Sequence, residues 1–284
     1  MPRVGRRTAL AGGAALLLGS CGSGRSERDA TPTTGRVRYG TDHPDQHAVL
    51  GRPDSAPRAL VVLLHGGFWQ AAYGADLMEP VAADLRLHGF ATWNVEYRRV
   101  GDGGGWPATF VDVARAVDHV RTLGPLSRLP VVLVGHSAGG QLATWAASRD
   151  AGTPGGAPRV RPTATVSLSG VLDLTAAADQ GVGGGAVPAL LGAMPADDPG
   201  RYAAADPSRR VPAHSAVTAV HALEDTVVPL DQSRRYVAAA VAAGGEAALV
   251  TVPGGHFALT DPASEAWERV RSEITSAART PAGS

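Results

Sequence analysis

The sequence predicts an α/β fold, with a doubly wound, mostly parallel sheet and helices on both of its faces. Short apolar runs rich in β-branched residues recur along the chain, and most are bounded by glycine or proline. Runs of this kind are typical of strands buried on both faces of a sheet. Helical patterns separate the runs, and this alternation favours parallel strands joined by helical crossovers.

The individual elements follow from the order of these patterns. The predicted strands cover residues 58–65, 90–95, 130–134, 164–168, 217–222 and 247–252, and the predicted helices cover 107–123, 138–148, 233–243 and 263–277. In the first helix Phe110, Val113 and Val117 recur at three- and four-residue steps, the spacing of one apolar helix face. Residues 175–212 are less regular, and we expect either a small lid over a site or an ordinary surface excursion.

Composition excludes several classes of protein. Hydrophobic residues make up 44% of the 284-residue chain, which is enough to bury a core. Lys and Arg together number 26, as do Asp and Glu, so the balanced charge gives no reason to expect nucleic acid or a polybasic membrane clamp. No spacing of His, Asp and Glu suggests a metal site, and the glycine runs lack a nucleotide-binding context. We therefore expect no cofactor and no metal.

The first residues have the layout of an export signal. Arg3, Arg6 and Arg7 form a positive start, and the apolar run 9–18 that follows is too short for a stable membrane span. The Arg6-Arg7 pair resembles a twin-arginine signal. The sequence LGSC, ending at Cys21, resembles the lipobox of bacterial lipoproteins, in which the cysteine is acylated after cleavage.

These features divide the chain into three parts. Residues 1–21 are predicted to be a signal peptide with Cys21 as the lipidation site, 22–35 a flexible linker, and 36–284 the folded domain. Cys21 is the only cysteine, which excludes an intramolecular disulfide, and its alternative interpretation is a free thiol in a disordered start. We expect an exported protein, either anchored at the cell surface or secreted, that contacts the membrane only through this anchor.

A candidate nucleophile follows the predicted strand 130–134. The sequence GHSAG places Ser137 between Gly135 and Gly139, directly before a helical pattern. This G-x-S-x-G arrangement is typical of the nucleophile elbow of the α/β-hydrolase fold, a sharp turn between strand and helix that presents the hydroxyl above the sheet. The glycines remove side chains that would collide in the turn.

A candidate oxyanion loop follows the predicted strand 58–65. A tetrahedral intermediate needs preorganised N–H donors for its negative oxygen. One donor in this fold is the residue after the nucleophile, here Ala138, and another comes from the loop after an earlier strand. By position, the sequence HGGFW predicts donors at Gly67 and Phe68. Trp69 is a candidate for substrate contact, with core packing as its alternative.

The base of a serine nucleophile is a histidine that follows it in this fold. Of the histidines after Ser137, His214 precedes a predicted strand and His221 lies inside one. His256 lies in the loop after the last predicted strand, where the base must reach over the sheet edge. The sequence therefore predicts His256 as the base.

The acid that orients this histidine is expected at the end of the strand 217–222. Asp225 is the preferred candidate in the loop that follows, with Glu224 and Asp231 as alternatives. Asp173 follows an earlier strand, and we expect it to be a structural carboxylate bound to loop backbone.

Together these motifs carry a family resemblance. The segments HGGFW, NVEYRR, GHSAGG, SLSGVLDL, HALEDTVVPLDQS and PGGHF extend from about Leu60 to Phe257. They resemble the esterase branch of the α/β hydrolases, which includes kynurenine formamidases (arylformamidases), feruloyl-esterase-like enzymes and relatives of hormone-sensitive lipase. Relatives of hormone-sensitive lipase usually carry a third glycine where Phe68 stands here. Kynurenine formamidases are generally cytoplasmic, and the export signal departs from that pattern.

The resemblance implies a serine hydrolase with the triad Ser137, Asp225 and His256. The expected substrate is a small carboxylic ester or an N-formyl or aryl amide, cleaved through an acyl-enzyme. Two alternatives remain: a non-enzymatic surface lipoprotein that uses the fold to bind a ligand, and a peptidase similar to the dipeptidyl and prolyl-oligopeptidase enzymes. The sequence predicts no particular oligomeric state.

Overall fold

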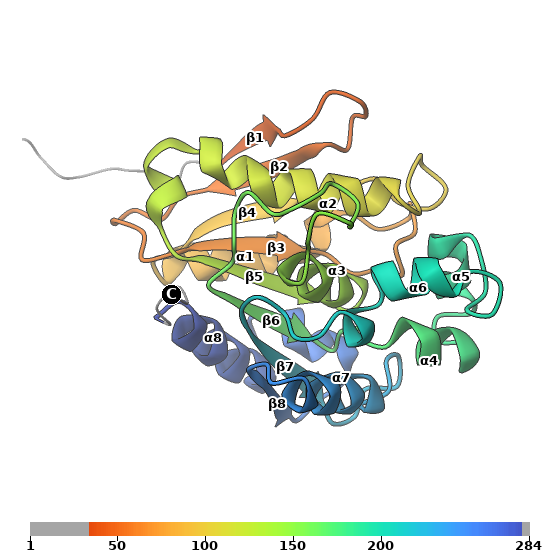
Figure 1. The fold of residues 1–284 in the computed structure, drawn as a ribbon. Coiled ribbons are helices and arrows are strands. Elements are labelled where there is room, and N and C mark those ends of the chain that lie inside the picture. The colour runs from red at the N-terminus through yellow and green to blue at the C-terminus, as the bar shows by residue number, and fades with distance from the viewer. Residues whose placement is uncertain (1–33, 280–284) are drawn as a thin grey trace, which may run out of the picture. The chain divides into compact units, whose positions relative to one another are not determined.

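An eight-stranded sheet forms the centre of the structure (Figure 1). The computed structural model describes residues 34–279, and the predicted signal peptide, Cys21 and most of the predicted linker lie outside them. The strand order is β1-β2-β4-β3-β5-β6-β7-β8. The β1–β2 and β2–β4 pairs are antiparallel and the other pairs are parallel, which confirms the predicted mostly parallel α/β fold.

The structure gives each element its bounds. The strands are β1 (Thr34–Arg38), β2 (His47–Gly51), β3 (Leu60–Leu64), β4 (Ala91–Val95), β5 (Val131–His136), β6 (Ala164–Leu168), β7 (Ala216–Ala222) and β8 (Ala247–Val252). The α-helices are α1 (Glu79–Leu87), α2 (Ala108–His119), α3 (Ala138–Ala147), α4 (Leu174–Asp179), α5 (Ala186–Leu191), α6 (Pro199–Ala205), α7 (Asp231–Ala242) and α8 (Glu265–Ala277). Short 3-10 turns are η1 (Ala75–Met78), η2 (Val120–Thr122), η3 (Gly124–Arg128), η4 (Pro207–Arg209) and η5 (His256–Thr260).

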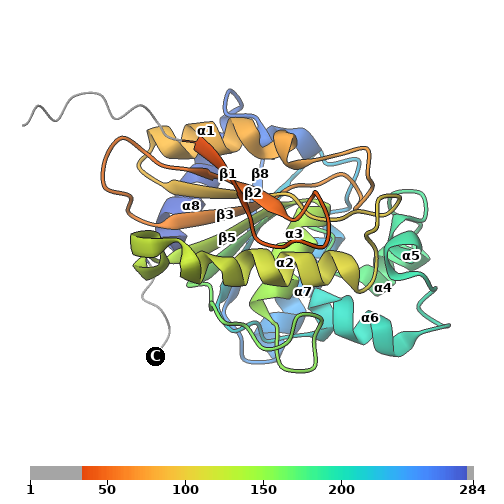
Figure 2. The same ribbon diagram turned by 90° about the horizontal axis from the view of Figure 1, so that it is seen from above.

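Both faces of the central strands are buried, and each face has its own apolar core. Leu60, Val62 and Leu64 of β3 belong to the core that includes α2 and α3. Val61 and Leu63 of the same strand belong to the core that includes α1 and α8. Figure 2 shows α1 and α2 on opposite sides of the sheet. Successive side chains of a strand point to opposite faces, so only an apolar residue at every position serves both cores.

Two strands at one edge and the helix α1 were not predicted from the sequence. In β1 (TGRVR) only one residue is even partly buried, so the strand lacks the apolar alternation that would reveal it. The predicted linker 22–35 also ends too late, because residues 34 and 35 pair with β2. Residues 175–212 form α5, α6, η4 and most of α4, so the segment is more regular than its sequence indicates. Among the helices of residues 34–279, none combines the length and apolarity that crossing a membrane requires.

The turn between β5 and α3 lies directly against the end of β3. A Cβ on Gly139 would lie 2.1 Å from the carbonyl oxygen of Leu64 and 2.5 Å from that of His65. A Cβ on Gly135 would lie 2.0 Å from the carbonyl oxygen of Gly139. These oxygens are backbone atoms of the sheet and the helix and cannot move aside, so the turn requires glycine at both positions.

We expect Gly139→Ala to lower the free energy of unfolding by roughly 3 kcal/mol or more, because relief of the overlap must displace α3 from β3. The matched control is Gly35→Ala in β1, where an added Cβ meets nothing within 4 Å. Urea unfolding measures both, and we expect the control to stay within about 0.5 kcal/mol of the wild type. Equal stability of the two variants would contradict the tight contact.

Candidate active site

Strained backbone gathers at the carboxyl ends of neighbouring strands. Within residues 34–279, four non-glycine residues have positive φ: Phe68 (53°), Trp69 (57°), Ser137 (56°) and Ser169 (44°). They follow β3, β5 and β6, which lie side by side in the sheet. Each such residue costs on the order of 1–3 kcal/mol and persists only where its surroundings hold it in place. We therefore expect the functional site at this edge of the sheet.

Ser137 occupies the turn between β5 and α3. Its backbone angles are φ 56° and ψ −118°, and α3 begins at the next residue. The Ser137 N–H donates to the carbonyl of Leu168 at the end of β6, with 2.8 Å between nitrogen and oxygen. The side chain thus stands at a helix N-terminus, where the helix dipole favours negative charge.

His256 and Asp225 form a close pair. Nδ1 of His256 donates to Oδ2 of Asp225 at 2.7 Å, and the Asp225 side chain is only 1% exposed. The other carboxylate oxygen accepts the N–H groups of Val227 and Val228, both at 2.9 Å. Burial alone would raise the pKa of Asp225. Hydrogen bonds from His256, the Val228 N–H and the Ser169 hydroxyl outweigh it and lower that pKa far below its usual value.

His136, which precedes Ser137, fixes the loop that carries His256. Its Nε2 donates to the backbone carbonyl of His256 at 2.9 Å, and the two ring centroids are 4.5 Å apart. Complete burial, together with the neighbouring His256, lowers the pKa of His136 to about 3. The ring is therefore neutral at physiological pH, with its proton on Nε2.

A small pocket contains both Ser137 and His256. Its volume is about 120 Å³. The wall consists of residues from four loops: Gly66, Gly67, Phe68, Tyr73, Leu77, His136, Ser137, Val227, His256, Phe257 and Thr260. Tyr73, Leu77 and Phe257 are 42%, 43% and 69% exposed, so an apolar rim surrounds the opening. Sequence reasoning missed Tyr73 and Leu77, which belong to no motif.

The residues expected to bind an oxyanion lie around this pocket. Gly67 and Phe68 line it directly, and Ala138 begins the helix behind Ser137. A Cβ on Gly66 would lie 3.1 Å from Cβ of Ser137, so the HGG loop and the elbow are in contact. The backbone N–H groups of Gly67, Phe68 and Ala138 donate to no acceptor within the described residues.

Trp69 lies elsewhere, and its predicted contact with substrate is corrected. Its side chain is buried, is absent from the pocket wall, and donates from Nε1 to Oε1 of Gln141 at 3.1 Å. The two consecutive left-handed residues Phe68 and Trp69 turn the loop so that Phe68 faces the pocket and Trp69 enters the core.

Glu96 clamps the loop that carries Gly67 and Phe68. One carboxylate oxygen accepts Nε2 of His65 at 3.1 Å, and the other accepts the N–H of Ala75 at 2.9 Å. Arg99 forms an ion pair with the same carboxylate at 3.1 Å. Burial favours the neutral form of Glu96, but the hydrogen bond from His65 and its other partners lower its pKa below the usual value. The clamp therefore holds both ends of the segment 65–75.

Sequence reasoning missed Glu96, whose neighbours Tyr97 and Arg98 also support the loops around the site. The Tyr97 hydroxyl donates to the carbonyl of His65 at 2.8 Å, and Arg98 binds Asp112 through two nitrogens at 2.7 Å each. The available signal was the sequence NVEYRR, which places a carboxylate directly after a buried strand.

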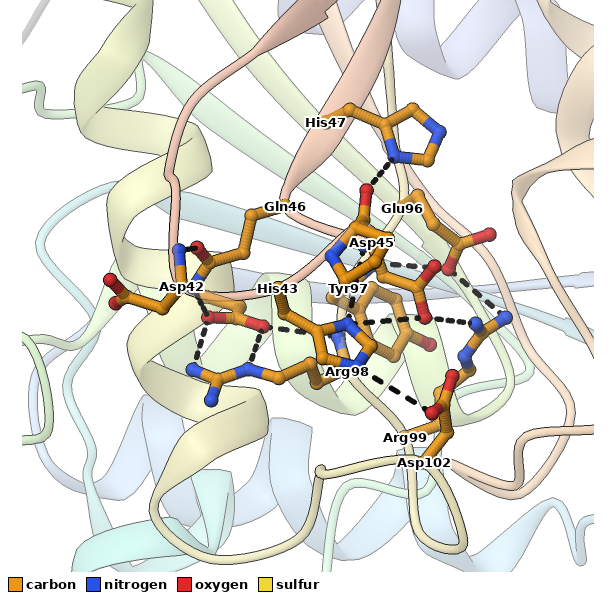
Figure 3. A network of polar contacts seen from close by, with 12 residues as sticks. Asp42, His43, Asp45, Gln46, His47, Glu96, Tyr97, Arg98, Arg99 and Asp102 are labelled. Carbon is orange, nitrogen blue, oxygen red and sulfur yellow. Dashed lines mark hydrogen bonds and ion pairs between the residues drawn. The ribbon is translucent and has the colours of Figure 1, made fainter.

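One grouping near this clamp has the composition of a metal site. Ligand atoms of His43, Asp45 and Asp102 lie within 4.8 Å of one another (Figure 3). Arg99 already pairs with Asp45 at 2.6 Å. A guanidinium at that distance repels a divalent cation, so the cluster fits an ion-pair network better than a metal centre.

The other candidate residues have structural partners. Asp231 pairs with Arg235, and Glu224 accepts the N–H of Gly254. Asp173 caps α4 by accepting the N–H of Ala176 at 2.8 Å. His221 is buried beneath the acid loop and donates from Nε2 to the carbonyl of Val228 at 3.0 Å.

Solved structures of esterases share this fold. A truncated carbohydrate esterase from gut microbiota superposes with a TM-score of 0.72 at 21% identity, covering 89% of this chain and 98% of that one. Esterase B from Lactobacillus rhamnosis gives a TM-score of 0.72 at 18% identity, covering 86% and 84%. Esterase 2 of Thermogutta terrifontis, phosphonylated by sarin, gives 0.67 at 18%, covering 86% and 93%. These similarities confirm the α/β-hydrolase fold.

The sequence itself matches one protein family. No curated protein sequence matches the chain. A family model described as BD-FAE matches residues 50–239, about two thirds of the chain. The chain therefore belongs to the BD-FAE family, whose members are esterases of the α/β-hydrolase type.

Proposed function

We propose that this protein is a serine hydrolase that cleaves short-chain carboxylic esters through an acyl-enzyme. One observation carries the proposal: Ser137 and His256 line the same pocket, and His256 is hydrogen-bonded to the buried Asp225. A carboxylate on Nδ1 leaves Nε2 as the free basic nitrogen of the imidazole and stabilises the imidazolium once it forms. The phosphonylated form of the Thermogutta esterase is consistent with a reactive group in this fold.

The reaction proceeds in two halves. His256 Nε2 takes the Ser137 proton as Oγ attacks the ester carbonyl, and the carbonyl electron pair moves onto oxygen. The oxyanion lies toward the N–H groups of Ala138, Gly67 and Phe68. When it collapses, the alkoxide leaves with the proton from His256. Water then attacks the acyl-enzyme, giving its proton to His256, and the acid leaves as Ser137 regains its proton.

The pocket limits the size of the acyl group. Its volume of about 120 Å³ is well below the roughly 300 Å³ at which pockets for drug-sized ligands begin. An acetyl group or a short acyl chain fits this volume, and the leaving group remains at the apolar rim. The similar fold of the gut carbohydrate esterase adds acetylated sugars to the substrates worth testing. N-formyl amides carry an acyl group smaller still, so formamide hydrolysis belongs to the same proposal.

We expect Ser137→Ala to lower hydrolysis of p-nitrophenyl acetate at least about a thousandfold and to abolish labelling by a fluorophosphonate probe. Spectrophotometric assays with p-nitrophenyl acetate, N-formylkynurenine and acetylated glucose would establish the leaving-group preference. A wild-type protein that neither labels nor turns over any of the three would favour the non-enzymatic alternative. Preference for peptide substrates would favour the peptidase alternative.

Asp225→Asn should lower kcat for p-nitrophenyl acetate by roughly a thousand- to ten-thousandfold with little change in KM, because the amide no longer favours the productive tautomer of His256. Asp231→Asn is the matched control. It removes a carboxylate in a neighbouring segment whose one ion-pair partner among residues 34–279 is the exposed Arg235. Steady-state kinetics of both variants distinguishes the two carboxylates. Similar losses in both would argue against Asp225 as the orienting acid.

We expect kcat/KM to fall by roughly tenfold or more between p-nitrophenyl butyrate and the octanoate, because the longer chain exceeds the pocket. Leu77→Ala removes part of the wall and should raise the octanoate-to-acetate ratio of kcat/KM. The matched control is Leu87→Ala, which truncates an exposed leucine outside the pocket wall. An unchanged ratio in Leu77→Ala would show that the acyl chain binds elsewhere.

Protonation of His136 should destabilise the fold in mild acid. Its pKa is about 3 in the folded state and near 6.5 in the unfolded chain, so the unfolded state binds the proton more readily as pH falls below 6.5. This linkage lowers the free energy of unfolding by about 2 kcal/mol between pH 8 and pH 5.

The variant His136→Gln removes this titration and should show a pH dependence that is shallower by that amount in urea unfolding at the two pH values. Parallel curves for wild type and variant would contradict a buried, neutral His136.

A further inference from the structure

A strongly basic groove lies at the end of the sheet opposite the pocket. It has a volume of about 580 Å³, and five arginines line it: Arg121, Arg128, Arg159, Arg161 and Arg279. The remaining lining residues are neutral, and none is acidic. For a chain with equal numbers of acidic and basic residues, this is a marked local excess of positive charge.

The five guanidinium groups are available for a ligand. All five residues are exposed, and none forms an ion pair or donates a side-chain hydrogen bond within residues 34–279. They come from η2, η3, the loop before β6 and the second residue after α8, so distant segments converge on one surface. Arginine is always charged, and its fork of N–H donors suits the oxygens of phosphate.

The loop that carries Arg159 and Arg161 is held in a defined position. Asp118 accepts the N–H groups of Arg159 and Val160 at 2.8 and 3.3 Å. Its other oxygen pairs with the buried Arg149 at 2.9 Å, so the carboxylate is already neutralised. Asp118 therefore anchors the loop, and Arg149, which is not part of the groove wall, neutralises its charge.

The chain enters the domain at the same edge. Arg128 and Arg161 precede β5 and β6, whereas Ser137 follows β5 at its far end. Across the sheet, Thr34 is in register with Gly51, Thr92, Val61 and Val132, all at this amino-terminal edge of the parallel strands. Figure 1 shows β1 beginning and α8 ending on the same side of the sheet.

This edge is also the one nearest to the predicted lipid anchor along the chain. Cys21 precedes Thr34 by 13 residues (34 − 21), which span at most roughly 45 Å when extended. An acylated Cys21 would thus keep the groove within reach of phospholipid headgroups. A basic patch adds electrostatic attraction to anionic headgroups, and this attraction would fix the orientation of the tethered domain on the membrane.

We propose that the five arginines form a docking surface for the phosphate headgroups of an anionic membrane. Docking through this edge turns the pocket toward the opposite side, away from the lipid, where a water-soluble ester has access. The proposal does not depend on which ester the pocket accepts.

The test compares two double variants with the same change in net charge, both in the full chain carrying Cys21→Ala. The first is Arg128→Gln/Arg161→Gln in the groove. The control is Arg209→Gln/Arg234→Gln, two exposed arginines of η4 and α7 that lie outside the groove wall and form no ion pair in the described structure. Every protein has the same N-terminal segment, so a difference in binding reports the domain. Hydrolysis of p-nitrophenyl acetate shows that each variant is folded.

Co-sedimentation with vesicles of phosphatidylglycerol and phosphatidylcholine measures the partition coefficient, and pure phosphatidylcholine vesicles give the uncharged reference. We expect the partition coefficient for the anionic vesicles to fall about 25-fold in the groove variant, because each of the two lost charges contributes about fivefold. In the control variant it should fall less than about twofold. Raising the salt concentration should abolish the difference.

Equal losses in the two variants, or no loss in either, would overturn the proposal. Glycerol 1-phosphate serves as the soluble probe. If the groove variant loses binding of this probe but keeps its vesicle partitioning, the groove takes a free phosphate compound and the membrane assignment is wrong. A short DNA duplex is tested as a competitor of the vesicles for the protein. If the duplex displaces the vesicles at a lower phosphate concentration than theirs, the groove binds nucleic acid and the membrane proposal is wrong.

Discussion

The contact between the start of α3 and the end of β3 is the constraint on which the site depends. Gly139 approaches the carbonyl of Leu64 so closely that no side chain fits, and this approach holds the elbow against the HGG loop. Ser137 is then kept in a left-handed conformation that its own preferences oppose. Dense packing on both faces of the sheet provides the rigidity that maintains it.

Three polar clamps transmit that rigidity to the loops. Glu96 fixes both ends of the segment that carries Phe68, His136 holds the backbone of His256, and the N–H groups after Asp225 orient its carboxylate. Each clamp buries a charged or aromatic side chain together with hydrogen-bond partners. The turn between α4 and α5 adds a further support, because Gly183 lies against the ring of Phe68.

The parallel core of the fold was predictable because its strands are short, largely apolar runs, most of them bounded by glycine or proline. β1 was not, because an edge strand with exposed side chains carries no such pattern. In the site, the order of Ser137, Asp225 and His256 follows from where each motif lies relative to a strand. The pocket wall does not follow from motifs, because Tyr73 and Leu77 reach it through the path of a loop. Trp69 illustrates the same limit of prediction from motifs. Its position in HGGFW does not determine whether its side chain points into the pocket or into the core.

The separation of the pocket residues along the chain has a consequence for biosynthesis. Ser137 is fixed by β5 and β6, but His256 follows β8, the last strand of the described domain, and α8 then packs beneath the sheet. A nascent chain therefore completes its sheet before it completes the pocket. If His256 serves as the base, the elbow stays catalytically silent until the chain beyond β8 has been made.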